Sequence, residues 1–278
     1  MMPVIAMTQE MGSLAKDVAL QLAKASGLDV MRHEVLEHVA GRMHVPSSLI
    51  SRLREGKAGL VERLTTDEER VAVYTAQEVF ALADKGNVVL RGWGATCLLR
   101  PVRHVLRVRV TRSFRKRVEW LMGHLETDDA AFAESEVRRS DDAHAARMHD
   151  QFGVTWGDPV LYDLTLNTDR LSVESCVAQI QHLADQPEFQ ETSASRAMLA
   201  DLALNARIRA AMKDYDSTRN VNIQIESKEG KVVLSGIVLN AHESAEAARI
   251  SLTVPGIESI DNQLRLMTSS RRFTSAKY

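Results

Sequence analysis

The sequence predicts an α/β protein with a parallel sheet, followed by a small α+β unit. Up to Ala184, short apolar runs of strand character alternate with longer segments of helical periodicity, which is the pattern of a parallel sheet. After Ala184 the pattern changes to a polar, proline-containing stretch, a long helix and a β-hairpin. A chain of 278 residues is also more typical of two domains than of one.

The strands predicted in the first part are short and apolar, and the helices between them are amphipathic. The strands are residues 3–7, 87–92, 104–110 and 162–167. The helices are residues 13–25, 32–43, 46–56, 65–86, two within 113–149 that break near 126–129, and 172–184. In the first helix Leu14, Val18 and Leu22 recur every four residues, and Gly27 can end it. We expect this parallel sheet to carry helices on both faces.

The second part has the order helix, hairpin, helix, strand. The helix at 196–215 precedes a hairpin at 220–240 that turns at Lys228-Glu229-Gly230. A helix at 241–256 and a strand at 257–267 complete an αββαβ unit. The expected domains are residues 1–184 and 195–268, with a linker at 185–194 and a polar tail at 269–278.

The composition excludes several classes of protein. Apolar residues make up 45% of the chain, and the net charge of −2 provides no overall field for nucleic acid. Cys97, Cys176 and the histidines show no metal-ligand spacing, and two cysteines form no disulfide framework. No stretch approaches the roughly 18 apolar residues of a membrane span, and the first residues lack the basic start of a secretory signal. We expect a cytoplasmic protein that binds no nucleic acid and has no membrane span and no metal site of its own.

Residues 10–17 join the first predicted strand to the first helix, the position at which many proteins hold phosphate. Backbone N–H groups at a helix N-terminus attract anions, and a lysine neutralises phosphate charge. The segment offers Gly12, Ser13 and Lys16, but it does not match G-x-x-x-x-G-K-[ST]. From the spacing alone, a phosphate site and an ordinary strand–helix turn both remain open.

Basic residues gather in the predicted helix pair, and they too allow two interpretations. They are Arg112, Arg115, Lys116, Arg117, Arg138, Arg139 and Arg147. Arginines that close over a transferring phosphoryl group stabilise its negative charge. Acidic neighbours such as Glu134 and Asp142 favour an ordinary solvated helix face instead. Trp93, between two glycines, is placed either to stack on a base or to fill the core.

Four segments, in order, resemble the cytidylate kinase-like family of P-loop nucleoside monophosphate kinases. They are residues 8–17, 92–100, 112–122 and 152–180, and the likeness extends over residues 1–183. Its most specific part is 156–167, which reads W-x-D-P-x-x-Y-D-L-x-L-N. The resemblance implies a P-loop kinase fold, a nucleotide ligand, ATP and Mg²⁺ as cofactors, and phosphoryl transfer from ATP to a nucleotide or a related small acceptor.

The resemblance also implies roles for individual residues. The phosphates of the cofactor would lie on Gly12, Ser13 and Lys16. Catalytic roles would fall on Lys16, Arg117 and Arg139. Acceptor binding would fall on Arg32, Arg91, Trp93 and Asp141.

The chain departs from the family pattern at the predicted phosphate turn. Leu14 and Ala15 replace two glycines, so side chains stand where a backbone would approach phosphate closely. Lys16 replaces an arginine and keeps its charge, whereas Arg32 replaces an acidic residue that would face the acceptor or its magnesium. We therefore expect weak phosphoryl transfer. The alternative is a non-catalytic, nucleotide-responsive regulator that signals through the second domain.

The second part, residues 195–267, resembles a BON domain. The likeness rests on the hairpin with Gly230 and Gly236 and on Pro255-Gly256 before the last strand. It implies a module that takes a protein or lipid ligand, or that forms a homo-oligomer.

Overall fold

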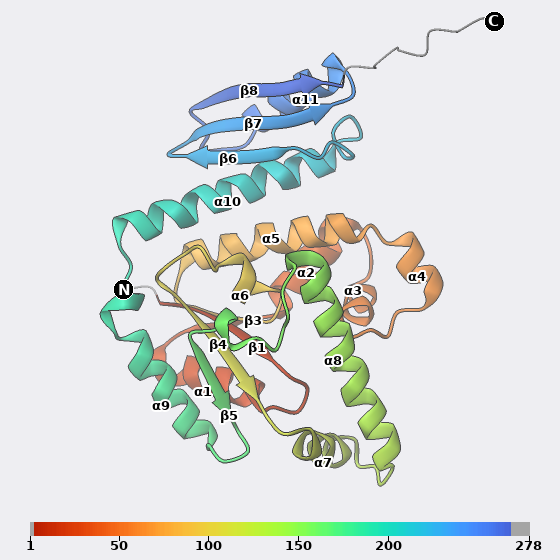
Figure 1. Cartoon of the computed structure of the whole chain (residues 1–278), viewed down its shortest axis with the longest axis vertical. Helices are drawn as coiled ribbons and strands as arrows, with labels where there is room; N and C mark the ends of the chain where they lie inside the picture. The colour runs from red at the N-terminus through yellow and green to blue at the C-terminus, as the bar shows by residue number, and fades with distance from the viewer. Residues whose placement is uncertain (1–2, 268–278) are drawn as a thin grey trace, which may run out of the picture. The chain divides into compact units, whose positions relative to one another are not determined.

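The computed structural model describes residues 3–267, and the chain divides into two compact units, Met1–Ala200 and Asp201–Tyr278 (Figure 1). Unit 1 contains a five-stranded sheet and unit 2 a three-stranded sheet. The predicted linker at 185–194 contains a 3-10 turn at Pro187–Phe189 and the start of helix α10 (Ser193–Asp214). The predicted polar tail at 269–278 lies outside the described residues.

The sheet of unit 1 is parallel throughout, as the sequence predicts, and has the order β2-β3-β1-β4-β5. Its strands are β1 (Val4–Gln9), β2 (Asp29–Met31), β3 (Val88–Arg91), β4 (Val105–Thr111) and β5 (Leu164–Asn167). The sequence pattern does not predict β2, because three residues at the sheet edge are too short to show a period. β1 lies at the centre and is buried from Val4 to Thr8, since helices cover both faces of the sheet.

The helices of unit 1 follow the predicted segments, with two additions. They are α1 (Ala15–Ser26), α2 (His33–Met43), α3 (Ser47–Arg54), α4 (Leu60–Thr65), α5 (Glu68–Lys85), α6 (Ala95–Leu98), α7 (Phe114–Leu125), α8 (Ala130–Phe152) and α9 (Val173–Ala184). The short helices α4 and α6 were not predicted. Asp67 caps α5 by accepting from the N–H of Arg70, so this helix begins later than the predicted residue 65.

One face of the sheet carries an extensive apolar cluster. In this cluster α1 and α9 pack on each other and on β1 and β4, with Leu22, Ile180 and Val108 fully buried. On the other side α5 packs on β3 and against α2. A 3-10 turn at Pro159–Leu161 leads into β5. Among residues 3–267 no helix has the length and apolar character to cross a membrane. Cys97 and Cys176 are free thiols.

Unit 2 has the predicted αββαβ order. Strand β6 (Gln224–Lys228) pairs antiparallel with β7 (Lys231–Val238), and β7 pairs parallel with β8 (Ser259–Leu266). Helices α10 and α11 (Ala241–Leu252) contribute to one apolar core with the inward residues of these strands. The hairpin turn needs a glycine, because Gly230 has φ 80° and an added Cβ would lie 3.1 Å from the carbonyl oxygen of Gly256.

The α1–α9 contact should dominate the stability of unit 1, and two leucines on α1 test this. Leu22 is fully buried and Leu20 is half exposed, so Leu22→Ala should cost about 2–5 kcal/mol of unfolding free energy and Leu20→Ala under about 1 kcal/mol. The three tryptophans all lie in unit 1, so urea unfolding followed by their fluorescence reports on this unit alone. Equal losses in the two variants would contradict the assignment.

Candidate functional site

The turn between β1 and α1 retains the backbone donors of an anion site. Gly12 (φ 77°) and Leu14 (φ 61°) are both left-handed, and Leu14 is the N-cap of α1 without a side-chain hydrogen bond. The first N–H groups of α1 therefore have no side-chain acceptor in the described part of the chain. The Oγ of Ser13 is buried there and likewise has no hydrogen-bond partner. This combination attracts a negative charge to the start of α1.

Glu10, at the end of β1, joins three elements through its carboxylate. One oxygen accepts from Nη2 of Arg109 at 2.6 Å, and the other accepts from the hydroxyl of Thr111 at 2.7 Å and the backbone N–H of Arg112 at 3.2 Å. Nε of Arg117 on α7 lies 3.6 Å from the second oxygen. Glu10 thereby ties the end of the central strand to β4 and to α7.

Arg117 holds α7 against the turn. Its guanidinium donates two hydrogen bonds to the carboxylate of Asp141 on α8, at 2.9 and 2.7 Å, and the side chain is almost fully buried. Gly12 lies so close to α7 that an added Cβ would be 3.1 Å from the Cα of Arg117 and from the ring of Trp120. Met11 packs on the apolar cluster that α7 and α8 share. Helix α7 of the predicted helix pair is therefore docked onto the turn, and Asp141 links it to α8.

Four arginines lie together at the carboxyl end of β3 without a carboxylate partner. The guanidinium of Arg54, from α3, lies 3.7 Å above the ring of Trp93, and the Trp93 Nε1–H donates to the carbonyl of Arg32 at 3.1 Å. Both Nη atoms of Arg147, from α8, donate to the carbonyl of Arg54 at 2.9 and 2.7 Å. Arg91 ends β3. None of these four, which we call the arginine cluster, forms an ion pair with another described residue.

The charges of the arginine cluster are compensated only from a distance, by Asp17 near Arg91 and by Glu68 near Arg147. Burial, followed by the charge of Arg32, lowers the pKa of Arg91 to about 10. Burial and the charges of Arg147 and Arg32 likewise lower the pKa of Arg54 well below its ordinary value. Nη1 of Arg91 donates to the amide oxygen of Gln9 at 3.4 Å, but its Nε is buried without a hydrogen-bond partner among residues 3–267. A bound anion would relieve both the repulsion and the unsatisfied donor.

Two stacked rings, those of Trp156 and His144, lie beside the arginine cluster. Arg109 lies 4.5 Å from the ring centroid of Trp156 on one side, and the ring of His144 stacks on Trp156 at 4.2 Å. The Trp156 Nε1–H donates to the hydroxyl of Thr8 at 3.1 Å, which fixes the indole against β1. Burial, together with the charges of Arg147, Arg54 and Arg109, lowers the pKa of His144 to about 3, so this ring is neutral near pH 7.

The structure brings most of the predicted site residues to this edge of the sheet. Gly12, Ser13, Arg117 and Asp141 meet around the turn, and Arg32, Arg91 and Trp93 belong to the arginine cluster or contact it. Lys16 is exposed on α1 and forms no ion pair with another described residue. Trp93 is buried and Arg54 covers its ring, so a base would have to displace Arg54 to stack there. The roles assigned to these residues remain predictions.

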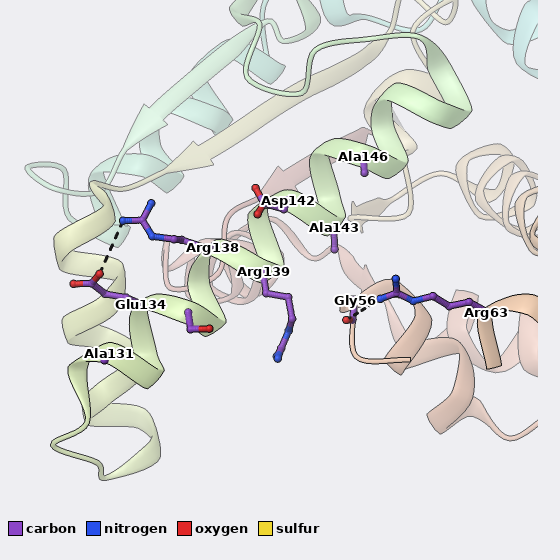
Figure 2. Close-up of a pocket in the computed structure, with 10 residues that line it drawn as sticks. Gly56, Arg63, Ala131, Glu134, Arg138, Arg139, Asp142, Ala143 and Ala146 are labelled. Atoms are coloured by element: carbon purple, nitrogen blue, oxygen red, sulfur yellow. Dashed lines mark hydrogen bonds and ion pairs between the residues drawn. The ribbon is translucent and has the colours of Figure 1, made fainter. Parts of the chain in front are cut away.

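Arg139 lies apart from the turn. It pairs with Glu136 on α8, and Lys57 lies 3.8 Å from the same carboxylate. Asp141 follows two residues later and therefore projects to the other side of the helix. Figure 2 shows Arg139 on an open groove of about 830 Å³ between α8 and the segment from Gly56 to Arg63. Arg139 thus belongs to this groove, and its predicted catalytic role remains a prediction.

Sequence reasoning missed Glu10, Arg54, Arg109 and His144 as site residues. A signal was present for Arg109, because Arg107 and Arg109 are the two charged residues in the strand 105–110, and a charged side chain within an apolar strand needs a partner. For Arg54 no local signal existed, since its helix resembles any amphipathic surface helix.

Residues 4–170 match the model of the Cytidylate kinase-like family, and residues 200–268 match that of the BON domain. The chain belongs to the cytidylate kinase-like family. The structure of an uncharacterized protein from Eubacterium ventriosum is similar to this chain, with a TM-score of 0.53 and 17% sequence identity. The superposition covers 66% of this chain and 99% of that protein, and at this identity it shows the fold alone. A shikimate kinase from Bacteroides thetaiotaomicron, 16% identical, covers 67% of this chain and all of its own with a TM-score of 0.44.

The BON domain of this cytidylate kinase-like protein also has a curated relative. Osmotically-inducible protein Y of Escherichia coli (strain K12) is 29% identical over 66 residues, which are 24% of this chain. The match spans about a third of the length of that relative.

His144 should make the stability of unit 1 fall as the pH is lowered. The unfolded chain binds a proton at this histidine below about pH 6.5, whereas the folded chain holds it neutral down to about pH 3. Between pH 7 and 5 this difference removes roughly 1–2 kcal/mol of unfolding free energy. In urea unfolding, His144→Gln should lose less unfolding free energy between pH 7 and 5 than the natural chain does. The control His149→Gln, at an exposed position, should lose as much as the natural chain. The same pH dependence in all three proteins would contradict the buried neutral ring.

Proposed function

We propose that unit 1 binds a nucleoside phosphate, with a phosphate group on the arginine cluster. The observation that carries this proposal is the position of Arg32, Arg54, Arg91 and Arg147, which gather at the carboxyl edge of the parallel sheet without carboxylate partners. Ligands of open parallel sheets bind at that edge. A phosphate accepts several charge-assisted hydrogen bonds at once, and arginine is the residue best shaped to donate them.

A second phosphate-bearing molecule is proposed at the start of α1. The N–H groups of the uncapped helix, the unpartnered hydroxyl of Ser13 and the exposed Lys16 supply donors and one positive charge. These residues fit the phosphates of ATP, and Mg²⁺ bound mainly by phosphates needs only one or two protein oxygens, for which Ser13 is the candidate. ATP supplies the transferable phosphoryl group, and Lys16 neutralises charge at its phosphates.

Transfer between the two sites is proposed to be slow. Arg117 already binds Asp141 and Glu10, so it must leave these partners before it can stabilise a transferring phosphoryl group. Leu14 places a side chain in the turn, and Arg32 supplies a cation where an acidic group would orient acceptor or metal. The same observations favour the second candidate function, a nucleotide-responsive regulator that binds without turnover.

Removing one charge of the arginine cluster should weaken binding of a nucleoside monophosphate. Arg54→Met keeps an unbranched side chain over Trp93 but removes the guanidinium, so the dissociation constant should rise about tenfold or more. Arg103→Met is the matched control. Arg103 is exposed and precedes β4, so it lies at the amino ends of the strands, whereas the arginine cluster lies at their carboxyl ends. Calorimetric titration with each common nucleoside monophosphate measures both. An unchanged affinity of Arg54→Met would contradict the site.

Lys16→Ala should separate the two proposed sites. It should raise the dissociation constant for ATP about tenfold or more and leave that for the monophosphate unchanged. A coupled assay with ATP, Mg²⁺ and each monophosphate then compares the natural protein with a variant carrying Leu14→Gly, Ala15→Gly and Arg32→Asp. Because Arg32→Asp should weaken binding of the monophosphate, turnover is compared at saturating monophosphate, where we expect slow turnover in the natural protein and faster turnover in the variant. Turnover of several per second in the natural protein would refute the slow-transfer proposal, and binding without any turnover would favour the regulator.

A further inference from the structure

Strand β8 of unit 2 forms an edge of its sheet. Among residues 3–267 its one hydrogen-bonded neighbour is β7, and Figure 1 shows it as the outermost strand. The N–H of Met267 donates to the carbonyl of Val238 on β7, so the odd-numbered residues direct their backbone groups toward β7. The even-numbered residues from Ile260 to Leu266 therefore direct theirs toward the open edge. An open edge of this kind is a template for another strand.

The side chains of β8 are arranged symmetrically about Gln263. Asp261 lies two positions before Gln263 and Arg265 two positions after it. Both side chains are exposed, on the face of the sheet that carries no helix. Ile260 and Leu266 stand three residues on either side, on the face toward the helical core. Arg265 forms no ion pair with another residue in the described part of the chain, and Asp261 accepts only from the amide of Gln263.

We propose that β8 pairs antiparallel with β8 of a second copy of this chain, with the two Gln263 residues opposite each other. In this register Asp261 of each copy faces Arg265 of the other, which gives two ion pairs across the two-fold axis. Ile260 faces Leu266 on the other side of the sheet, which gives two apolar cross-strand pairs. The result is a continuous six-stranded sheet with the helices of both copies on the same face.

The backbone agrees with this register. Ile260 and Leu266 direct their N–H and C=O groups toward the open edge, so they form the hydrogen-bonded pairs of the antiparallel ladder. Asp261 and Arg265 then form the non-hydrogen-bonded pairs, in which side chains approach most closely. The amide of Asn262 currently accepts from the N–H of Leu264 and must release it for the central bonds to form. An edge of eight residues buries less than a standard interface, so we expect micromolar affinity.

The self-complementary charges allow a sharp test with the full chain. Asp261→Arg and Arg265→Asp each place like charges opposite each other, so each should raise the dimer dissociation constant about tenfold or more in sedimentation velocity. The double variant restores opposite charges and should dimerise like the natural chain. A mixture of the two single variants should form a heterodimer, because one then carries two arginines and the other two aspartates. Glu226→Arg on β6 is the control, since β6 forms the other edge of the sheet.

Several results would overturn the proposal. The first is a natural chain that stays monomeric up to ~100 μM. The second is a dimer that both single variants still form. The third is a loss of the dimer that neither the double variant nor the mixture restores, although circular dichroism shows that these variants are folded. A monomeric chain that sediments with phosphatidylglycerol vesicles, and does so only with Arg265 present, would assign this edge to a lipid surface instead. All these measurements omit nucleotide, so they are independent of the function proposed for unit 1.

Discussion

The carboxylate of Glu10 is the constraint on which the site in unit 1 depends. It stands at the end of the central strand, where a buried charge needs several partners, and it finds them in Arg109, Thr111, the backbone of Arg112 and Arg117. These contacts hold the end of β4 and the first turn of α7 against the end of β1. A neutral residue at this position would leave Arg109 buried between Trp156 and Tyr162 without a counter-charge.

The same constraint helps to explain why the arginine cluster forms no ion pair with another described residue. Both Glu10 oxygens are occupied by the β4 and α7 side of the site, and Asp141 is occupied by Arg117. On the β3 side, Arg91 is left with the neutral amide of Gln9, and Arg54 with the face of Trp93. Unit 1 therefore separates its charges. Carboxylates and arginines are paired around the turn, whereas the arginine cluster beside it forms no ion pair with another described residue and has Asp17 and Glu68 only as more distant opposite charges. Such a separation is costly in an empty site and favourable once an anion is bound.

The fold was largely predictable from the sequence, and the site was predictable only in part. Apolar runs and helical periods report burial, so they predicted the parallel sheet and the αββαβ unit, but not the three-residue strand at Asp29–Met31. Gly12 and Ser13 were singled out because they lie between the first strand and the first helix. Arg54 and His144 were not singled out. Arg54 stands out only because it lies over Trp93 and forms no ion pair with another described residue, and His144 only because its ring stacks on the indole of Trp156. Such properties arise from segments far apart in the chain, and no local pattern encodes them.

The docked state of α7 sets a condition on any ligand at the turn. To reach Arg117, a phosphate must compete with a two-bond contact to Asp141 and with Glu10, and α7 must also leave its apolar contact with Met11. A ligand shifts such an equilibrium only by the difference in its affinity for the open and the docked state, so part of its binding free energy is consumed in opening. The arginine cluster requires no such opening, because its cations have no carboxylate to leave. An anion on the arginine cluster would therefore bind without this conformational cost, whereas an anion that engages Arg117 would have to meet it.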